Sequence, residues 1–148
     1  MPKNVTPNIA YDATKQKQQQ NSDLPKILIV EDDPVIASSL ARQLTRWNYE
    51  ATYVQEFDHV MQEFEEAQPD LVLMDIDMPE MDGIETAKRI MEMTDHTVPI
   101  LFVTALCDRQ TVTLCRNLDA AGYIVRPYKP VFVKTEIKRI LMGRSEIE

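Results

Sequence analysis

Five short apolar segments, each followed by a stretch with helical spacing, constrain the fold of this chain most strongly. Short strands that are apolar throughout are typical of a parallel sheet buried on both faces. The stretches between them repeat apolar residues every three to four positions, as in helices that cover such a sheet. The sequence therefore predicts an α/β fold, with five parallel strands and helices on both faces joined by right-handed crossovers. The predicted strands are residues 26–30, 51–54, 71–74, 100–103 and 123–125.

Composition divides the 148 residues into one domain and two tails. Residues 1–25 are rich in Gln, Asn and Pro and show no apolar period, which indicates a solvated, disordered tail. The overall apolar fraction of 44% is sufficient for one globular core. We predict a domain at residues 26–142, with five helices starting near residues 34, 57, 84, 108 and 130, and a short C-terminal tail at residues 143–148.

The charge and the hydropathy pattern exclude several classes of function. The formal net charge of −8 argues against nucleic acid as a direct partner. No apolar run approaches the roughly 18 residues that span a bilayer, and the N-terminus has no apolar signal segment. We therefore expect no membrane insertion and a cytoplasmic location. The two cysteines, Cys107 and Cys115, are expected to be free thiols.

Polar or charged residues follow four of the predicted strands. Glu31 and Asp32 follow the first strand, Asp75 the third, Thr104 the fourth and Arg126 the fifth. In open α/β sheets, ligands bind beyond the carboxyl ends of the strands, where the strand order reverses. We therefore expect these side chains to form one site.

The acidic members of this set predict a metal site. Glu31, Asp32, Asp75 and, two residues further on, Asp77 would crowd one rim of the sheet. Two like charges about 4 Å apart repel by roughly 4 kcal/mol at an effective dielectric near 20, so such a cluster persists if a cation neutralises it or if some of the acids are protonated. Hard oxygen ligands suit Mg²⁺ or Mn²⁺, whereas zinc would need His or Cys ligands. Asp33 is interpreted as a helix cap instead.

The residues at the ends of the third, fourth and fifth strands suggest which reaction the metal ion would assist. A carboxylate such as Asp75 can act as a nucleophile toward phosphorus and form an aspartyl phosphate. This reaction needs in-line attack and charge compensation. Arg126 could pair with one phosphoryl oxygen, and the Thr104 hydroxyl could donate to another. Each signal is weak alone, but together they predict a phosphoryl-accepting site.

In these segments the chain resembles the receiver domain of two-component response regulators, the CheY-like family. The resemblance covers about residues 26–142. It implies a doubly wound, flavodoxin-like sheet with strand order 2-1-3-4-5. It rests on four motifs, Ile27-Leu-Ile-Val-Glu-Asp-Asp-Pro34, Leu71-Val-Leu-Met-Asp-Ile-Asp-Met-Pro-Glu-Met-Asp-Gly83, Ile100-Leu-Phe-Val-Thr-Ala105 and Ala121-Gly-Tyr-Ile-Val-Arg-Pro-Tyr128.

The resemblance also implies roles for individual residues. Asp75 would be the phosphoacceptor. Asp32 would bind Mg²⁺ directly and Glu31 largely through water, and Asp75 and the backbone carbonyl of Asp77 would complete the protein ligands. Thr104 would be the switch hydroxyl that moves onto the phosphoryl group.

By the same resemblance, Tyr123 would be the switch aromatic that turns inward behind that hydroxyl, and residues 108–142 would pass the signal to a downstream protein. The phosphoryl donor would be a phosphohistidine on a sensor histidine kinase or a phosphotransfer protein. The chain would then be a signalling domain rather than an enzyme, with self-catalysed phosphorylation and dephosphorylation allowed. The resemblance is also compatible with a homodimer, in which the partner is a second copy of the chain.

Two alternatives follow from details of the motifs. The family pattern has Lys-Pro where this chain has Arg126-Pro127, a bond that the resemblance allows to be cis. Arg126 could pair permanently with Asp75, which would make the chain a pseudo-receiver that binds partners with little or no phosphorylation. Alternatively, Asp75-Ile-Asp77 superficially fits the nucleophile and acid of a haloacid-dehalogenase-like phosphohydrolase. A phosphohydrolase of this kind would have no role for Glu31 and Asp32. A short motif without its expected structural context is also weak evidence for a function.

Overall fold

The computed structural model of the chain describes residues 23–79 and 81–147, with side chains described as far as residue 143. The tail expected at residues 1–25 therefore lies outside the described residues up to position 22, and residue 148 of the C-terminal tail lies outside them as well. Helix α7 extends to Ile147, past residue 142, where the sequence placed the end of the domain.

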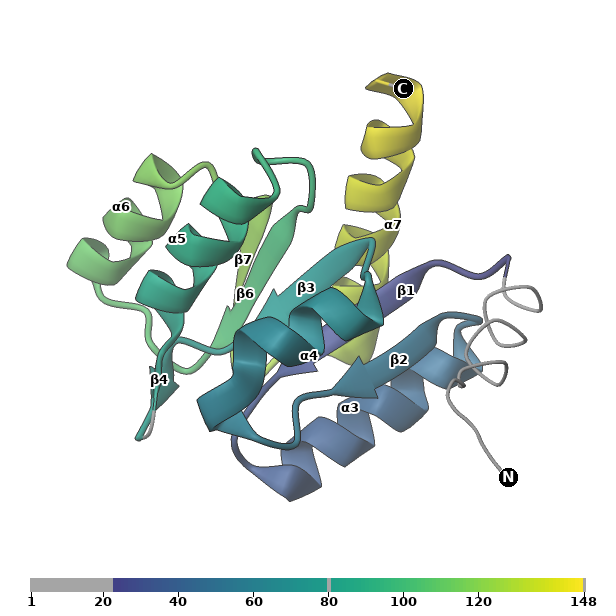
Figure 1. Cartoon of the computed structure of the whole chain (residues 1–148), viewed down its shortest axis with the longest axis horizontal. Helices are drawn as coiled ribbons and strands as arrows, with labels where there is room; N and C mark the ends of the chain where they lie inside the picture. Colours follow the sequence, from purple (N-terminus) through teal and green to yellow (C-terminus); the bar gives the residue numbers. More distant parts are fainter. Residues whose placement is uncertain (1–22, 80, 148) are drawn as a thin grey trace, which may run out of the picture.

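Five parallel strands form the central sheet (Figure 1), in the order β2-β1-β3-β6-β7. Counted along the chain, this is the order 2-1-3-4-5 of a doubly wound fold, so the predicted fold class is confirmed. The strands are β1 (Lys26–Val30), β2 (Glu50–Tyr53), β3 (Leu71–Met74), β6 (Ile100–Thr104) and β7 (Gly122–Val125).

Five α-helices connect and follow these strands. Aspartates begin three of them: the carboxylates of Asp33, Asp82 and Asp108 accept hydrogen bonds from first-turn amides, which satisfies donors that have no partner within the helix. The expected cap role of Asp33 is thereby confirmed. The helices are α3 (Pro34–Arg46), α4 (Val60–Ala67, after the 3₁₀ turn η1 at Phe57–His59), α5 (Gly83–Met93), α6 (Arg109–Asn117) and α7 (Pro130–Ile147).

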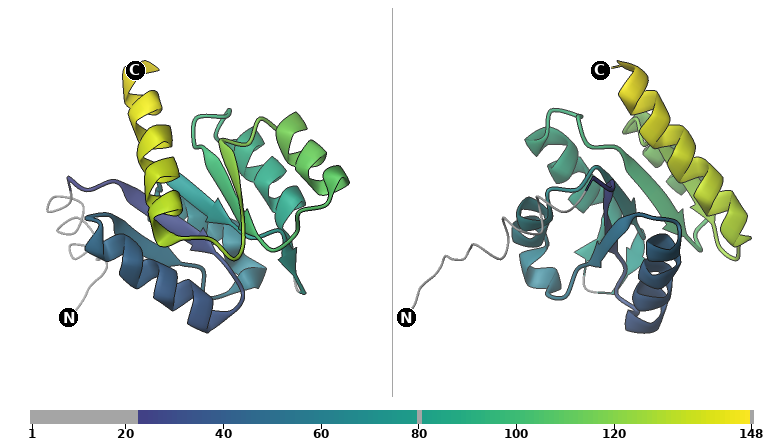
Figure 2. Two further views of the ribbon diagram at one scale, coloured as in Figure 1. Left: turned by 180° about the vertical axis from the view of Figure 1, so that it is seen from behind. Right: turned by 90° about the vertical axis from the view of Figure 1, so that its right-hand side faces the viewer.

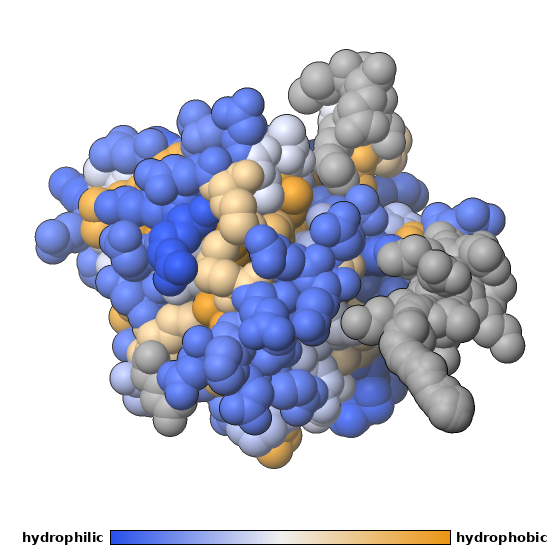
Figure 3. Space-filling view, viewed as in Figure 1, coloured by the Kyte–Doolittle hydropathy of each residue, from blue (hydrophilic) through white to orange (hydrophobic). Residues whose placement is uncertain are grey.

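The helices lie in two layers, one on each face of the sheet, as Figure 2 shows edge-on. Alternate residues of one strand enter opposite cores: Leu28 of β1 packs with α4, α5 and α6, whereas Ile29 packs with α3 and α7. Both faces of β1 and β3 are therefore buried, which explains why these strands are apolar from Ile27 to Val30 and from Leu71 to Met74. Outside the cores, hydrophilic residues cover most of the face seen in Figure 3, and apolar residues show mainly in a narrow band beside α5.

Several local features differ from the sequence expectation. β2 and β7 begin one residue earlier than predicted, and β6 ends one residue later. A small antiparallel pair, β4 (Asp77–Met78) and β5 (Met81–Asp82), lies where only a turn was expected. Strands of two residues are too short to produce a periodic pattern. α7 continues through Gly143, although glycine costs about 1 kcal/mol relative to alanine in a helix interior. None of the helices in the described ranges is long and apolar enough to cross a membrane.

Candidate functional site

The carboxyl ends of the two central strands bring three acids together. β1 and β3 are neighbours with Val30 opposite Met74, so Glu31 and Asp75 leave the sheet at the same level. One carboxylate oxygen from each of Glu31, Asp32 and Asp75 lies within 4.8 Å of the others. Glu31 and Asp75 are buried, with exposed fractions of 7% and 6%. We call these three residues the acid cluster; the sequence predicted all of them.

Arg126 closes the acid cluster from the end of β7. Its Nη1 lies 2.9 Å from Oε1 of Glu31, and its Nη2 lies 3.1 Å from Oδ2 of Asp75. Burial acts to lower the pKa of Arg126, but the hydrogen bond and charge of Glu31 and the charge of Asp75 outweigh it and raise that pKa. The guanidinium is therefore a fixed positive charge shared by two buried acids. The pair with Asp75 was foreseen as an alternative, whereas the pair with Glu31 was not.

Glu31 is held by neighbours on both carboxylate oxygens. Besides the guanidinium on Oε1, the backbone amide of Asp33 donates to Oε2 at 3.1 Å. Burial raises the pKa of Glu31, the hydrogen bonds from Asp33 and Arg126 oppose this rise, and the charge of Asp75 adds to it. Taking this carboxylate out of water is thus unfavourable unless cations or donors remain beside it.

Both oxygens of the Asp75 carboxylate are engaged as well. The amide of Ile76 donates to Oδ1 at 2.8 Å, and Arg126 pairs with Oδ2. Gly83, the first residue of α5, lies against the same backbone: a β-carbon built there would clash with the Asp75 carbonyl oxygen and lie 2.7 Å from Cα of Ile76. The sequence indicated a turn at Asp82-Gly83 but not this close approach.

Thr104 and Tyr123 both hydrogen-bond to the backbone of Leu106, which the sequence places beside the site as an apolar side chain but not as a link between these two residues. Thr104 is fully buried at the end of β6, and its Oγ1 accepts a hydrogen bond from the Leu106 amide at 3.3 Å. The hydroxyl of the partly buried Tyr123 donates to the Leu106 carbonyl. Burial, with smaller contributions from the charges of Cys115 and other neighbours, raises the pKa of Tyr123 to about 12. The hydroxyl and the aromatic ring are therefore connected through one loop residue.

The backbone also connects these strand ends to the arginine. The Arg126 amide donates to the Thr104 carbonyl at 2.8 Å, so the two residues leave the sheet as neighbours. The Arg126-Pro127 bond is cis, as the resemblance allowed. The Asp77 carboxylate, which the sequence placed among the acids of this rim, is not part of the acid cluster, and Asp77 is exposed in β4. The predicted role of its backbone carbonyl stays a prediction. Cys107 and Cys115 are free thiols, as expected.

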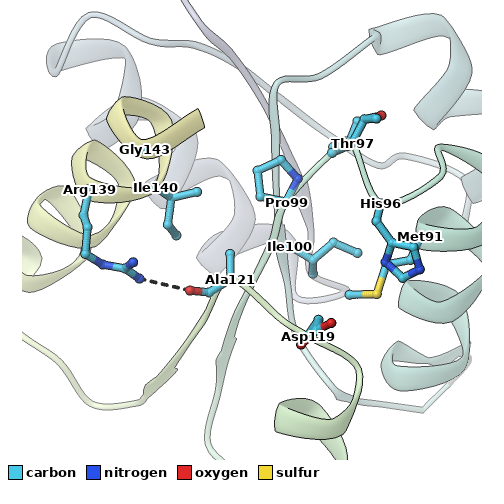
Figure 4. Close-up of a pocket in the computed structure, with 11 residues that line it drawn as sticks. Met91, His96, Thr97, Pro99, Ile100, Asp119, Ala121, Arg139, Ile140 and Gly143 are labelled. Atoms are coloured by element: carbon cyan, nitrogen blue, oxygen red, sulfur yellow. Dashed lines mark hydrogen bonds between the residues drawn. The ribbon is translucent and has the colours of Figure 1, made fainter. Parts of the chain in front are cut away.

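A cavity of about 510 Å³ lies at the other end of the sheet (Figure 4), between the end of α5, the start of β6 and α7. Its lining includes Met91, Ile100 and Ile140, and at its edge Nη2 of Arg139 donates to the Ala121 carbonyl at 3.0 Å. Ile100 is the first residue of β6 and Thr104 is the last. This cavity is therefore separate from the acid cluster and takes no part in its chemistry.

Comparisons with known proteins agree with this geometry. The family model described as the response regulator receiver domain matches residues 27–138. The chain is 34% identical over 116 residues to the transcriptional regulatory protein YvcP of Bacillus subtilis, covering 78% of this chain and 48% of that protein. It is 33% identical over 121 residues to the transcriptional regulatory protein BaeR of Escherichia coli, covering 82% of this chain and 50% of that protein.

The structure is similar to solved receiver domains over most of its length. A CheY-like receiver domain protein from Methanospirillum hungatei superposes with a TM-score of 0.79 at 25% identity, covering 85% of this chain and 100% of the other. The chain spans about half the length of the curated relatives that it matches.

Proposed function

The chain belongs to the response regulator receiver domain family, and from this premise we propose that it accepts a phosphoryl group onto Asp75 with the help of a divalent metal ion. The observation that carries the proposal is the acid cluster, in which Glu31, Asp32 and Asp75 converge beside one guanidinium. Phosphoryl transfer to a carboxylate needs such an arrangement, because catalysis depends on positioning and on compensation of charge.

The donor set of the acid cluster fits Mg²⁺, and Mn²⁺ as a second choice. All three side chains offer oxygen, and hard cations of this size prefer carboxylate and carbonyl oxygens with some waters retained. In the proposed site, Asp32 would hold the ion directly, Glu31 would act largely through water, and Asp75 and the backbone carbonyl of Asp77 would complete the protein ligands. A bound ion would supply positive charge beside the transferring phosphoryl oxygens.

In the proposed reaction, one carboxylate oxygen of Asp75 forms a bond to phosphorus while the bond from phosphorus to an imidazole nitrogen of the donor breaks. The electron pair of that bond goes to the imidazole, which takes a proton from solvent. Arg126 and the Thr104 hydroxyl then bind phosphoryl oxygens, and Tyr123 turns inward behind Thr104. The added charge favours only one arrangement of these two switch residues, so phosphorylation shifts the population of the two states.

The partners follow from family membership. We propose a sensor histidine kinase or a histidine phosphotransfer protein as the phosphoryl donor, and a protein target that contacts α6, β7 and α7, about residues 108–142. YvcP and BaeR are described as transcriptional regulators, which makes control of transcription one candidate for the pathway. We propose residues 26–142 as the functional unit and the cytoplasm as its location.

The direct test of the proposal is incubation with acetyl phosphate and Mg²⁺, followed by intact-mass measurement. We expect a mass increase of one phosphoryl group, which is lost in Asp75→Asn and when Mg²⁺ is removed with EDTA. Asp77→Asn is the matched control, because it removes a neighbouring carboxylate but keeps the backbone carbonyl. A phosphorylated Asp75→Asn variant would contradict the proposal.

One observation favours a second candidate, an interaction domain that works without phosphorylation. Arg126 already pairs with Asp75, and a persistent pair would hinder attack on phosphorus. This candidate predicts no adduct with wild-type protein, and partner capture that is unchanged in Asp75→Asn. The phosphohydrolase reading of Asp75 and Asp77 is disfavoured by membership in the receiver family.

A further inference from the structure

We propose that the cavity at the far end of the sheet from the acid cluster binds a small organic cation, an amine with an aromatic body. The body would fill the cavity, and the ammonium group would pair with Asp119 at its edge. The cavity volume of about 510 Å³ lies within the roughly 300–1,000 Å³ of sites that take small molecules. This binding site goes beyond phosphoryl transfer and uses none of the residues of the acid cluster.

The buried part of the cavity lining is apolar. Met91 of α5, Ile100 of β6 and Ile140 of α7 line it, and all three are buried (Figure 4). They belong to the two packed cores on either side of the sheet, so this surface is in place before a ligand arrives. The thioether of Met91 makes favourable contacts with aromatic rings, which favours an aromatic body for the ligand.

The edge of the cavity carries charges of both signs, and only the positive one already has partners. Nη2 of Arg139 lies 2.9 Å from Oε1 of Glu136 and donates to the Ala121 carbonyl at 3.0 Å. The carboxylate of Asp119 forms no ion pair or hydrogen bond with any described residue. An anionic ligand would therefore compete with Glu136 for the guanidinium, whereas a cationic ligand meets an unpaired carboxylate.

The balance of charge around the cavity also favours a cation. Among the described residues that line the cavity and their ion-pair partners, Asp119 and Glu136 are acidic and Arg139 is basic, with histidine counted as neutral. One negative charge is thus left over, on a chain whose formal net charge is −8. A field of this sign attracts small cations and repels small anions.

The backbone at Asp119 allows its charge to be removed without rebuilding the turn. Asp119 has a φ of 63° in the turn between α6 and β7, and its amide donates to the Arg116 carbonyl at 3.0 Å. Asparagine adopts this left-handed conformation as aspartate does. Asp95, with a φ of 54°, is the same residue type in the same conformation, but it is not among the described residues that line the cavity. Asp119→Asn and Asp95→Asn therefore form a matched pair.

The test is a titration of ¹⁵N-labelled protein with three indole ligands of nearly one size, followed through amide chemical shifts at low ionic strength. Tryptamine carries an ammonium group, tryptophol a hydroxyl and indole-3-acetate a carboxylate. We expect tryptamine to bind with a Kd on the order of 1 mM and to shift the amides of Ile100 and Ala121, but not those of Glu31 and Asp75. Tryptophol should bind about three- to fivefold more weakly, as the loss of one exposed ion pair predicts, and indole-3-acetate more weakly still.

The variants decide whether Asp119 is the partner of the ammonium group. Asp119→Asn should weaken tryptamine binding about three- to fivefold and leave tryptophol binding unchanged. Asp95→Asn should change neither Kd by more than about twofold, because its charge lies outside the cavity lining. The proposal is overturned by equal binding of tryptamine and tryptophol to wild type, by shifts centred away from the cavity, or by an Asp119→Asn variant that binds tryptamine as wild type does.

The acetyl phosphate experiment gives an independent result. Asp119 lies outside the acid cluster, so Asp119→Asn should still gain one phosphoryl group at Asp75. If wild type accepts no phosphoryl group but binds tryptamine through Asp119, the cavity proposal stands and phosphorylation of Asp75 is wrong.

Discussion

The hydroxyl of Tyr123 donates to the carbonyl of Leu106, the same loop residue whose amide donates to Thr104. Removing that hydroxyl in Tyr123→Phe should lower the free energy of unfolding by about 0.5–1.5 kcal/mol near neutral pH, the usual net value of one hydrogen bond. The ring contact with Phe102, with centroids 6.4 Å apart, would remain. Urea unfolding of wild type and variant measures the difference.

The pH dependence of that difference is a sharper check. The pKa of Tyr123 is raised from 10.0 to about 12 in the folded chain, so between these values the unfolded chain loses the proton while the folded chain keeps it. The free energy of unfolding of the wild type should therefore fall as pH rises from about 10 to 12. Tyr123→Phe should not show this fall, because it has no hydroxyl at position 123 to titrate. The stability gap between wild type and variant should shrink over this range.

Tyr53→Phe provides the control for both measurements, since within the described residues the Tyr53 hydroxyl makes no hydrogen bond. Its stability should stay close to that of wild type at neutral pH. A gap for Tyr123→Phe that stays constant from pH 8 to pH 12 would contradict the assigned role of burial in raising the Tyr123 pKa.

At the scale of elements, the start of α5 fixes the backbone that carries Asp75. A β-carbon at Gly83 would collide with the Asp75 carbonyl and Ile76, and backbone atoms cannot move aside as a flexible side chain can. We expect Gly83→Ala to destabilise the fold by about 1–3 kcal/mol, as overpacking does, and to reduce phosphorylation of Asp75 by acetyl phosphate. Thermal unfolding and intact mass measure the two effects.

Gly143→Ala is the matched change in another helix. Among the residues that the structure describes, and leaving aside the adjacent backbone of α7 itself, no atom lies within 4 Å of a β-carbon built at Gly143, in the interior of α7. There alanine should stabilise the fold by about 0.5–1 kcal/mol through its helix propensity. If both variants are destabilised equally, the collision at Gly83 is not the reason for its sensitivity.

How well the elements could be predicted depends on how their side chains are buried. β1 and β3 were placed from their apolar residues because both of their faces are covered. β4 and β5 were missed because each has only two residues and the pair lies outside the central sheet. α7 continues past residue 142, where the sequence analysis placed the start of a tail, because a helix tolerates a single glycine such as Gly143.

At the scale of the whole molecule, the strand order decides which residues meet. Glu31, Asp32 and Asp75 could be predicted as neighbours because the carboxyl ends of parallel strands share one edge. The pair of Arg126 with Asp75 was foreseen as an alternative, but its second pair, with Glu31, could not be predicted, because it depends on the side-chain reach of Arg126 across β6. The two hydrogen bonds that connect Thr104 and Tyr123 through the backbone of Leu106 could not be predicted either, because the conformation of a loop produces no periodic pattern in the sequence.

The last prediction concerns the effect of Mg²⁺ on the stability of the whole chain, whose formal net charge is −8. A ligand that binds only the folded state stabilises it by about 2.7 kcal/mol at one hundred times its dissociation constant, so Mg²⁺ should raise the melting temperature. NaCl at matched ionic strength screens the repulsion among the acidic side chains and should raise the melting temperature less than Mg²⁺ does.

Two variants test whether the acid cluster is the site of this effect. Asp32→Asn should abolish the extra rise in melting temperature with Mg²⁺, because Asp32 is the proposed direct ligand. Asp58→Asn removes an equal charge from an exposed position and should retain it. Equal effects of Mg²⁺ and NaCl on wild type would mean that the acid cluster does not bind the ion.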